Sequence, residues 1–311
     1  MNPKLIPHHQ INKSKWDTCI RQSTHPLITA QSWYLDIVAP EWNALVADDY
    51  NAVMPLPVVK KWRFRFLIQP LLVQQLGIFS TEPLSTRQTD SFYRIVKSMY
   101  PFLHLNAYNH LPQSLQLTQR INYTLSLNQN FSSLMAGFSK NCRRNIKKAE
   151  TLNLVLTDRI DTDTFIEFSR NHASYQFPPQ GWNKLRQIID SAIARNCGFS
   201  QAVTDDQNNL LAVAFFLINS NRITFLSGTS SPKGFQKKAM FLIIHQTIKT
   251  HCTNNLTLDF EGSEMNNIAR FYRGFGSLPE FYYQWTHPLT RFILQLKNNH
   301  YFCTKNQPDG N

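Results

Sequence analysis

The sequence is poor in cysteine, and its cysteines are not spaced as a metal site or a disulfide framework. The chain of 311 residues has five of them and no C-x-x-C pair; they are Cys19, Cys142, Cys197, Cys252 and Cys303. A scattered, odd-numbered set is typical of free thiols in a reducing compartment. The ten histidines show no H-E-x-x-H spacing either. We therefore expect neither structural disulfides nor a bound metal.

Long apolar runs are also absent. No segment approaches the ~20 apolar residues that a membrane-spanning helix needs. The N-terminal residues 1–16 lack the apolar core of a signal peptide. We therefore expect a cytoplasmic protein without a transmembrane segment.

Acidic residues are outnumbered. The chain has 20 Asp and Glu against 32 Lys and Arg, which gives a formal net charge of +12 and a pI near 9.5. Such a charge attracts phosphates on nucleic acid, on nucleotide cofactors or on an anionic membrane face. Hydrophobic residues make up 42% of the chain, which is enough for a packed core. The composition thus predicts a globular protein with an anionic substrate or carrier, and it leaves tRNA and peripheral contact with the inner membrane open.

The length predicts one large domain or two medium ones. The polar stretch 128–133 favours a boundary there, with domains at 1–130 and 131–311. In the second half, helices and strands alternate. Helices are expected at 162–171, 183–196 and 239–251, strands at 199–204, 210–219 and 221–227, and a polar loop at 228–238.

The segment 60–66 alternates basic with aromatic residues. It has the pattern of a surface that tracks a nucleic-acid backbone and stacks on its bases. The same alternation occurs in any half-buried edge strand, whose charges prevent edge pairing. We favour the edge strand.

A helix expected from Ser132 onward carries an unusual basic face. Its cations follow one another at steps of three and one, and they are Lys140, Arg143, Arg144, Lys147 and Lys148. Cys142, Ile146 and Ala149 lie on the opposite, apolar face. The cations lack the acidic partners four residues away that solvated helices ordinarily have. The face could therefore bind a phosphate-bearing ligand, or it could simply be solvated, and the two interpretations are equally supported.

The segment 256–277 predicts a strand, an acidic turn and a helix. Leu256, Leu258 and Phe260 alternate with polar residues, and Glu261 begins the turn. Apolar positions then recur every three or four residues, at Ile268, Phe271, Tyr272 and Phe275, until Gly276. Two carboxylates, Asp259 and Glu261, and the phenol of Tyr272 are candidate acid–base groups. The simpler interpretation is an amphipathic unit with incidental charges.

Three motifs resemble those of one protein group. They are S-K-N-C-R-R-N-I-K-K-A-E at 139–150, L-D-F-E-G-S at 258–263 followed by R-F-Y-R-G-F-G at 270–276, and Q-P-L-L-V-Q-Q-L-G-I at 69–78. In this order they resemble the FemAB-like branch of the GNAT acyltransferase superfamily, over about residues 30–285. The resemblance implies an α/β fold of tandem GNAT-like domains, each a mixed central sheet flanked by helices, with the active site in the second.

The resemblance also implies roles for individual residues. In GNAT domains two central parallel strands splay apart, and the acyl carrier binds in the gap with its phosphates at the following helix start. The implied carrier-binding residues here are Ser227, Gly228, Thr229, Lys233, Gly234, Lys237 and Lys238. The implied contacts to substrate phosphates are Lys140, Arg143, Arg144 and Lys147. Backbone donors at 227–229 would polarise the acyl carbonyl. The loop departs from the family pattern because it has one glycine where acyl-CoA loops commonly have two or more.

Tyr272 would be the general acid, with Glu261 or Asp259 as base. FemAB-like transferases have F-K-x-x-F-G at this place, with a lysine at the reacting centre, whereas GNAT acetyltransferases often have a tyrosine acid. Tyr272 therefore favours a thioester donor over aminoacyl-tRNA.

The expected function is an N-acyltransferase. Acyl-CoA or acyl carrier protein would be the co-substrate, no cofactor would be tightly bound, and the acceptor would be an amine. Two alternatives stay open: an aminoacyl-tRNA-dependent peptidyltransferase that acts on a cell-wall precursor, and a basic binding module without activity.

Overall fold

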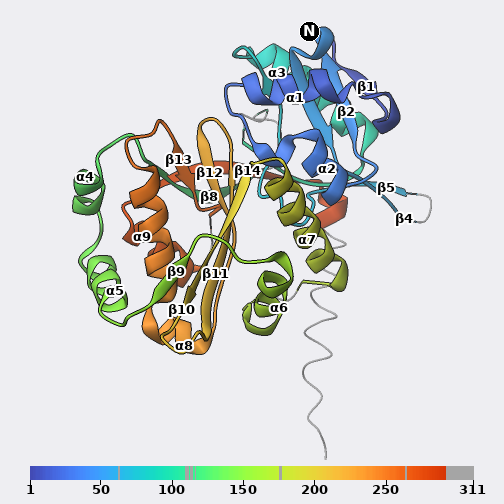
Figure 1. Ribbon diagram of the computed structural model, residues 1–311. Helices are drawn as coiled ribbons and strands as arrows, with labels where there is room; N and C mark the ends of the chain where they lie inside the picture. Colours follow the sequence, from blue (N-terminus) through green and yellow to red (C-terminus); the bar gives the residue numbers. More distant parts are fainter. Residues whose placement is uncertain are drawn as a thin grey trace, which may run out of the picture. The chain divides into compact units, whose positions relative to one another are not determined.

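The computed structural model describes residues 1–61, 64–108, 112, 115, 117–174, 177–262 and 265–291. The chain is a mixed α/β protein that divides into two compact units. The first unit comprises Met1–Arg120 and the segment from Tyr282 onward, and the second comprises Ile121–Phe281 (Figure 1).

This division differs from the predicted one between residues 130 and 131. The polar stretch at 128–133 is a connection inside the second unit, because the chain on either side of it pairs with that unit. The backbone N–H of Leu127 donates to the carbonyl of Leu256 at 2.8 Å, and that of Thr253 donates to Gln129 at 3.0 Å.

The first unit contains two groups of strands. One sheet has the order β1-β2-β3-β6, with β1 (Lys4–Ile6), β2 (Asn43–Ala47), β3 (Ala52–Leu56) and β6 (Phe79–Ser80). The other group contains β4 (Val58–Lys61), β5 (Phe64–Ile68), β7 (Phe102–Ala107) and the end of β14 (Leu278–Thr286), with β5 and β7 parallel. Its α-helices are α1 (Lys13–Gln22), α2 (Ser32–Val38) and α3 (Thr86–Met99). Short 3-10 turns are η1 (His8–Gln10), η2 (Ile28–Ala30) and η3 (Asp48–Tyr50).

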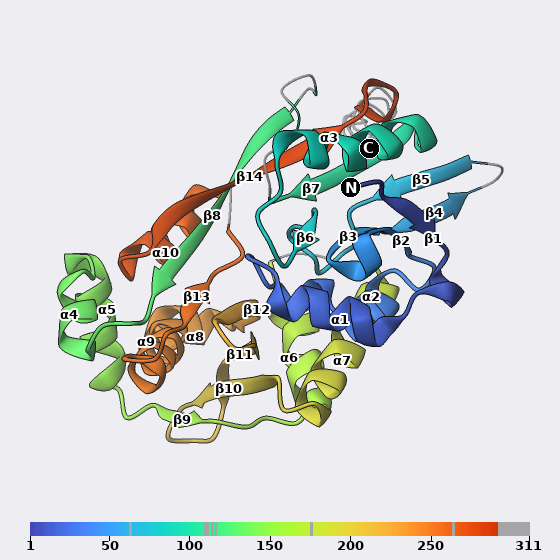
Figure 2. The ribbon, with the colours of Figure 1, turned by 90° about the horizontal axis from the view of Figure 1, so that it is seen from above.

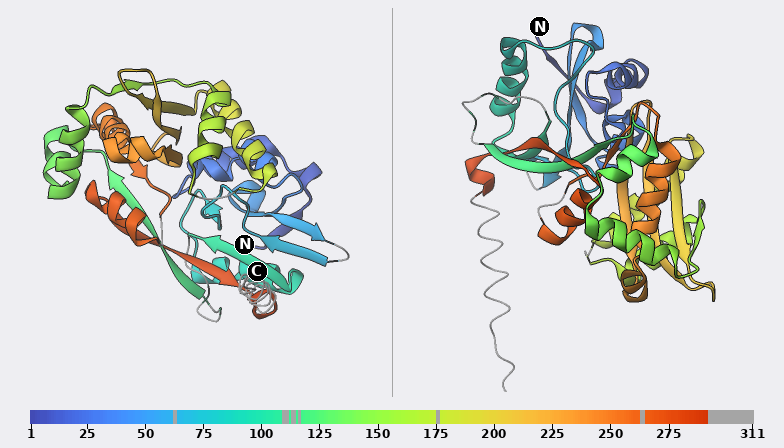
Figure 3. Two further views of the ribbon diagram at one scale, coloured as in Figure 1. Left: turned by 90° about the horizontal axis from the view of Figure 1, so that it is seen from below. Right: turned by 90° about the vertical axis from the view of Figure 1, so that its left-hand side faces the viewer.

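Helices lie on both sides of the β2–β3 strands, as the right-hand view of Figure 3 shows. On one side α3 contributes Phe92, Tyr93 and Val96 to the core. On the other side α1 buries Trp16, whose ring contacts Trp42 at 4.6 Å. The basic-aromatic segment forms the β4–β5 hairpin, and its residues 62–63 lie outside the described part of the chain.

The second unit is built on the strand order β8-β13-β12-β11-β10-β9. The strands are β8 (Leu117–Ser126), β9 (Val155–Thr157), β10 (Gly198–Thr204), β11 (Leu210–Ile218), β12 (Arg222–Ser230) and β13 (Thr257–Asp259). The helices are α4 (Phe131–Ala136), α5 (Lys140–Glu150), α6 (Thr162–His172), α7 (Pro179–Ala194), α8 (Pro232–Lys237), α9 (Ala239–His251) and α10 (Asn266–Gly274). β12 and β13 are parallel, and the other pairs in this order are antiparallel.

The two faces of this sheet are covered by different helices. Side chains alternate along β11, so that Phe215 contacts Phe165 of α6 while Phe216 packs in the cluster that contains Ile243 and Ile244 of α9. Figure 2 shows α5 and α9 on one side of β10 and β11, and α6 and α7 on the other.

The parallel pairing in the centre of the sheet is short. β12 and β13 pair only from Arg222 opposite Thr257 to Thr224 opposite Asp259, while β12 continues to Ser230. Beyond this point no described strand pairs with the edge of β12 that faced β13, and we call this stretch its open edge.

Most expected elements of the second unit are present, but the loop predicted at 228–238 is wrong. β12 runs through Ser230 and α8 follows almost at once. The last residues of β12 include serine and threonine, which are common in loops, and so the sequence pattern did not predict that the strand continues to Ser230. The start of α8 had a local signal: the Ser231 side chain accepts a hydrogen bond from the Gly234 N–H, and Pro232 occupies the first helical position.

Candidate active site

A cavity of about 820 Å³ lies in the second unit, beside the open edge of β12. Its walls come from α5, the end of α6, β12, α8, the start of α9 and α10. The apolar part of the wall includes Phe225, Met240, Phe241, Ile268 and Phe271. The volume is that of an ordinary small-molecule site.

Tyr272 lines this cavity from α10. Its ring stacks on Phe260 with a centroid distance of 4.6 Å and also contacts Phe225 at 6.4 Å, so its position is fixed by aromatic neighbours. Among the described residues, no hydrogen-bond partner is found for its hydroxyl. Burial raises the pKa of the Tyr272 hydroxyl, and the carboxylates of Glu261 and Asp259 raise it further. The phenol is therefore protonated at neutral pH and can donate to a ligand.

The open edge of β12 supplies backbone donors. The N–H of Ser231 bonds to the Leu211 carbonyl at 2.9 Å, and Gly228 stands opposite Ala214. Since antiparallel partners alternate between bonded and non-bonded pairs, the N–H groups of Gly228 and Ser230 point away from β11, toward the open edge. A side chain at position 228 would overlap the Phe225 ring. Glycine thus lets the Phe225 ring pack directly against the backbone of β12 at this position.

Four cations line the cavity, and no carboxylate does among the described residues of its wall. Arg144 and Lys148 come from α5, Lys238 from the junction of α8 and α9, and Arg270 from α10. Lys238 adopts a left-handed conformation, with φ 63° and ψ 30°. The set favours an anionic ligand with an apolar portion.

The basic face of α5 is divided between two roles. Cys142, Ile146 and Ala149 are buried, as predicted. Of the four predicted phosphate contacts on α5, Arg144 lines the cavity, whereas Lys140, Arg143 and Lys147 do not. Arg143 instead donates to the carbonyls of Met135 and Ala136, at 3.4 and 3.3 Å, at the end of α4. Lys140 and Lys147 are exposed.

The predicted carrier-binding residues are also divided. Gly228, Thr229, Gly234 and Lys238 line the cavity, and Ser227 does not. The Thr229 Oγ1 atom is buried without a hydrogen-bond partner among the described residues.

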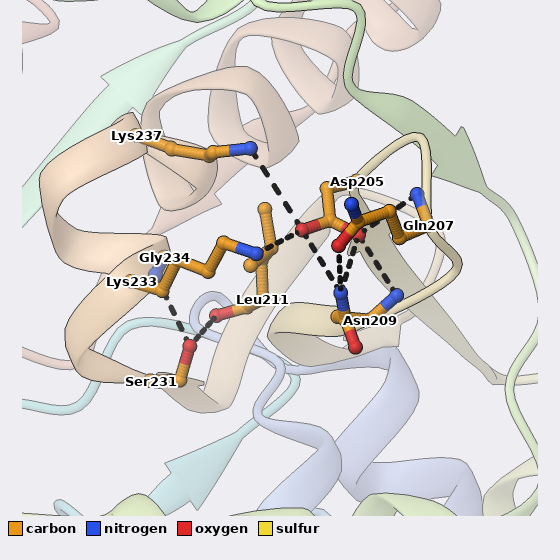
Figure 4. Close-up of polar contacts among 8 residues, drawn as sticks. All are labelled: Asp205, Gln207, Asn209, Leu211, Ser231, Lys233, Gly234 and Lys237. Carbon is orange, nitrogen blue, oxygen red and sulfur yellow. Dashed lines mark hydrogen bonds and ion pairs between the residues drawn. The ribbon is translucent and has the colours of Figure 1, made fainter.

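Lys233 and Lys237 do not line the cavity because a buried carboxylate holds them. The Nζ of Lys233 donates to Asp205 Oδ2 at 2.5 Å, and that of Lys237 lies 3.8 Å from the same oxygen (Figure 4). The Oδ1 atom of Asp205 accepts from the backbone N–H groups of Gln207 and Asn209. The Lys233 ammonium holds the pKa of the Asp205 carboxyl well below its usual range. The prediction that both lysines contact phosphate does not fit this arrangement.

The acidic turn after β13 is a structural cluster outside the cavity wall. Asp259 is 2% exposed and accepts from Arg222 at 2.5 Å, from Asn122 at 2.9 Å and from the backbone of Glu261 at 2.8 Å. Neither Asp259 nor Glu261 lines the cavity. The predicted catalytic residues are thus brought near one another, but only Tyr272 borders the space where a substrate fits.

Glu261 occupies an unfavourable place. Its φ is 53°, a left-handed conformation that is uncommon for glutamate. Burial raises its pKa well above the usual value, the neighbouring Asp259 raises it further, and Arg222 partly offsets this.

Some residues of the cavity were not among the candidates from the sequence. Lys148 was placed on the basic face but not among the implied phosphate contacts, and Arg270 stands within a quoted motif without a pattern that pointed to the cavity. His172 and Phe235 gave no such signal, because only the tertiary fold brings the ends of α6 and α8 to the cavity. No group of three or more metal-ligating side chains occurs among the described residues, and no helix in this part of the chain is long and apolar enough to cross a membrane.

We predict that Glu261→Gln makes the protein relatively more stable as the pH rises. A raised carboxyl pKa in the folded state means that ionisation favours unfolding. The penalty is absent below the unfolded pKa of about 4.3 and grows as the pH increases toward the folded-state pKa. The difference in Tm between variant and wild type should therefore widen from pH 4 to pH 8. Glu167→Gln, at an exposed position of α6, is the control, and a difference that does not change with pH would contradict the assignment.

No family model and no curated protein matches this chain. Solved structures do match it. A FemX structure aligns with a TM-score of 0.65 and 11% identity, over 94% of this chain and 99% of FemX. L-PGS from Bacillus licheniformis aligns with a TM-score of 0.57 and 9% identity, over 92% and 95%. A tandem GNAT protein of the clavulanic acid biosynthesis pathway aligns with a TM-score of 0.51 and 9% identity, over 91% and 97%. The chain therefore has the fold of these proteins, a tandem GNAT protein and FemX among them, and this confirms the expected fold class.

Proposed function

We propose that this protein is an N-acyltransferase that moves an acyl group from a phosphate-bearing thioester donor, acyl-CoA or acyl carrier protein, to an amine. The observation that carries the proposal is the composition of one cavity, where the Tyr272 phenol, the open edge of β12 and four cations meet. The fold is that of acyltransferases, which supports a transferase. Fold alone does not assign a reaction, so the proposal rests on the cavity.

The cavity supplies three functions that such a transfer requires. Arg144, Lys148, Lys238 and Arg270 would pair with donor phosphates. The N–H groups of Gly228 and Ser230 would polarise the acyl carbonyl while the amine attacks it. A C–N bond forms, the C–S bond breaks, Tyr272 gives its proton to the departing thiolate, and the proton that the amine nitrogen loses returns to the phenolate of Tyr272. Its raised pKa keeps that proton in place until the thiolate leaves.

The two predicted bases are less well supported than the acid. Asp259 is occupied by three hydrogen-bond donors, and neither it nor Glu261 borders the cavity. The two carboxylates are better described as groups that act on Tyr272 through their charge.

The proposed donor site predicts that two pairs of cations on α5 differ in their contribution to acyl-CoA binding. Arg144→Ala combined with Lys148→Ala should weaken acyl-CoA binding roughly tenfold or more, because a hydrogen bond to a charged group contributes about 1.5–3 kcal/mol. Lys140→Ala combined with Lys147→Ala removes the same charge from the same helix outside the cavity and should leave the affinity unchanged. Calorimetric titration with acetyl-CoA and longer acyl-CoAs measures both. Equal effects of the two pairs, or no binding by the wild type, would count against a CoA donor.

The chemical role of Tyr272 predicts a loss of rate without a loss of binding. Tyr272→Phe keeps the ring stack on Phe260 and removes only the hydroxyl. General acids contribute about 10²–10⁴-fold, so kcat for thiol release with a panel of amines should fall at least a hundredfold while the donor Kd stays the same. Tyr123→Phe, which changes a neighbouring buried tyrosine that does not line the cavity, is the control. Unchanged turnover in Tyr272→Phe would favour a binding module without catalysis.

Aminoacyl-tRNA is a second candidate donor, and one observation favours it. The exposed cations Lys140 and Lys147 lie on the same helix as the cavity cations Arg144 and Lys148, so positive charge extends beyond the cavity. A polynucleotide is larger than the cavity and would use such a surface. The fold likeness to FemX agrees with this candidate.

For a tRNA donor the α5 variants should behave differently. Lys140→Ala combined with Lys147→Ala should weaken tRNA binding and lower the slope of log K against log salt by about 2, roughly one per lysine removed. Filter binding between low and moderate salt measures the slope. Weak or salt-insensitive tRNA binding by the wild type would exclude this donor and leave the thioester.

A further inference from the structure

α8 exposes a large aromatic side chain at the edge of the cavity. Phe235 is 71% exposed and lines the cavity wall. Burying such a side chain is favourable, and this position does not gain that contribution in the free protein. Single exposed apolar residues are common on protein surfaces, so the exposure alone assigns nothing. The place of the ring and the way it is held are what carry an inference.

The helix that presents Phe235 is firmly anchored. Lys233 and Lys237 bind the buried carboxylate of Asp205 on the β10–β11 turn (Figure 4). At the start of α8 the Ser231 hydroxyl lies 3.3 Å from the Leu211 carbonyl oxygen, to which it donates. Gly234 packs so closely on this carbonyl that a Cβ atom would overlap it. Phe235 is therefore presented on a fixed support, which lowers the entropy cost of using its ring for binding.

The cavity cations begin three residues after this ring. Lys238 directly follows α8 and lines the cavity, as do Arg144, Lys148 and Arg270 from α5 and α10. An exposed ring beside a group of cations is the combination that binds nucleotides, because a base stacks on the ring while phosphates pair with the cations. An apolar ligand would use the ring but not the cations, and a simple anion would use the cations but not the ring.

We propose that Phe235 is the stacking surface for the adenine ring of the donor, a subsite that lies at the mouth of the cavity and extends the proposed function on which it rests. The two candidate donors share an adenosine next to phosphate. Coenzyme A carries it at one end, and tRNA carries it at its 3′ end. The acyl group would then lie deeper in the cavity, toward Tyr272.

The test compares ligands with and without the base. Phe235→Ala should weaken binding of coenzyme A about tenfold, since stacking on an aromatic side chain contributes about 1–3 kcal/mol per base. Binding of 4′-phosphopantetheine, which lacks the adenosine part, should not change, and Phe235→Trp should retain the wild-type affinity for coenzyme A. Phe281→Ala, at a 48% exposed position of β14 away from the cavity wall, is the matched control.

A second arm separates the two sources of adenosine. Deacylated tRNA is compared with the same tRNA lacking its terminal adenosine, each with wild type and Phe235→Ala. A tRNA donor predicts that the variant loses affinity for intact tRNA only, whereas a CoA donor predicts that the variant changes coenzyme A binding and leaves tRNA unaffected.

Three results would overturn the subsite. They are unchanged binding of both adenosine ligands by Phe235→Ala, an equal loss for 4′-phosphopantetheine, and a loss confined to vesicles of phosphatidylglycerol, which would assign the ring to a lipid surface. If transfer from an acyl phosphopantetheine depends on Tyr272 but not on Phe235, the proposed function stands and the adenine subsite does not. If no transfer occurs but coenzyme A binding depends on Phe235, the adenine subsite stands and the proposed function does not.

Discussion

The buried carboxylate of Asp259 stands where the central strands of the second unit part, and the rest of the site depends on it. It accepts from Arg222 on β12, from Asn122 on β8 and from the backbone that follows β13. It therefore joins three neighbouring strands at the last residue pair of β12 and β13. Breaking a buried ion pair by removing one partner costs about 3–5 kcal/mol. The strands are thus held together up to this point, and β12 is left with an open edge beyond it.

This arrangement gives the acidic turn a purpose other than catalysis. A carboxylate with three donors cannot readily accept a substrate proton. The charges of Asp259 and Glu261 instead raise the pKa of the Tyr272 hydroxyl. The Tyr272 ring stacks on Phe260, the residue between the two carboxylates in the sequence. Tyr272 belongs to two environments, since it packs in the core cluster and also lines the cavity. The fold thereby holds a proton donor at the edge of a positively charged space.

Much of the fold could be predicted from local pattern. The helix at 239–251 has the predicted bounds, because the apolar periodicity there is clear. The buried side of α5 was also correct, since helical spacing alone determines which residues share a face. The end of β12 was missed because small polar residues are compatible with both a strand and a loop. The sheet ladder with β11, which is formed by residues distant in sequence, decides between them.

The site could be predicted only in part, and the reason is the same for each error. Lys233, Lys237 and Lys238 look alike in the sequence. Asp205, which lies 28 residues before Lys233, forms ion pairs with Lys233 and Lys237, and only Lys238 lines the cavity. Arg143 and Arg144 are adjacent, yet one caps α4 and the other faces the ligand space. A cation can bind a substrate only if no buried partner or free carbonyl is closer, and that competition is settled by tertiary contacts. Tyr272 was singled out by the helical periodicity and by the family resemblance. Two of its aromatic neighbours, Phe260 and Phe271, lie in the same short segment, whereas Phe225 and Tyr123 come from distant strands.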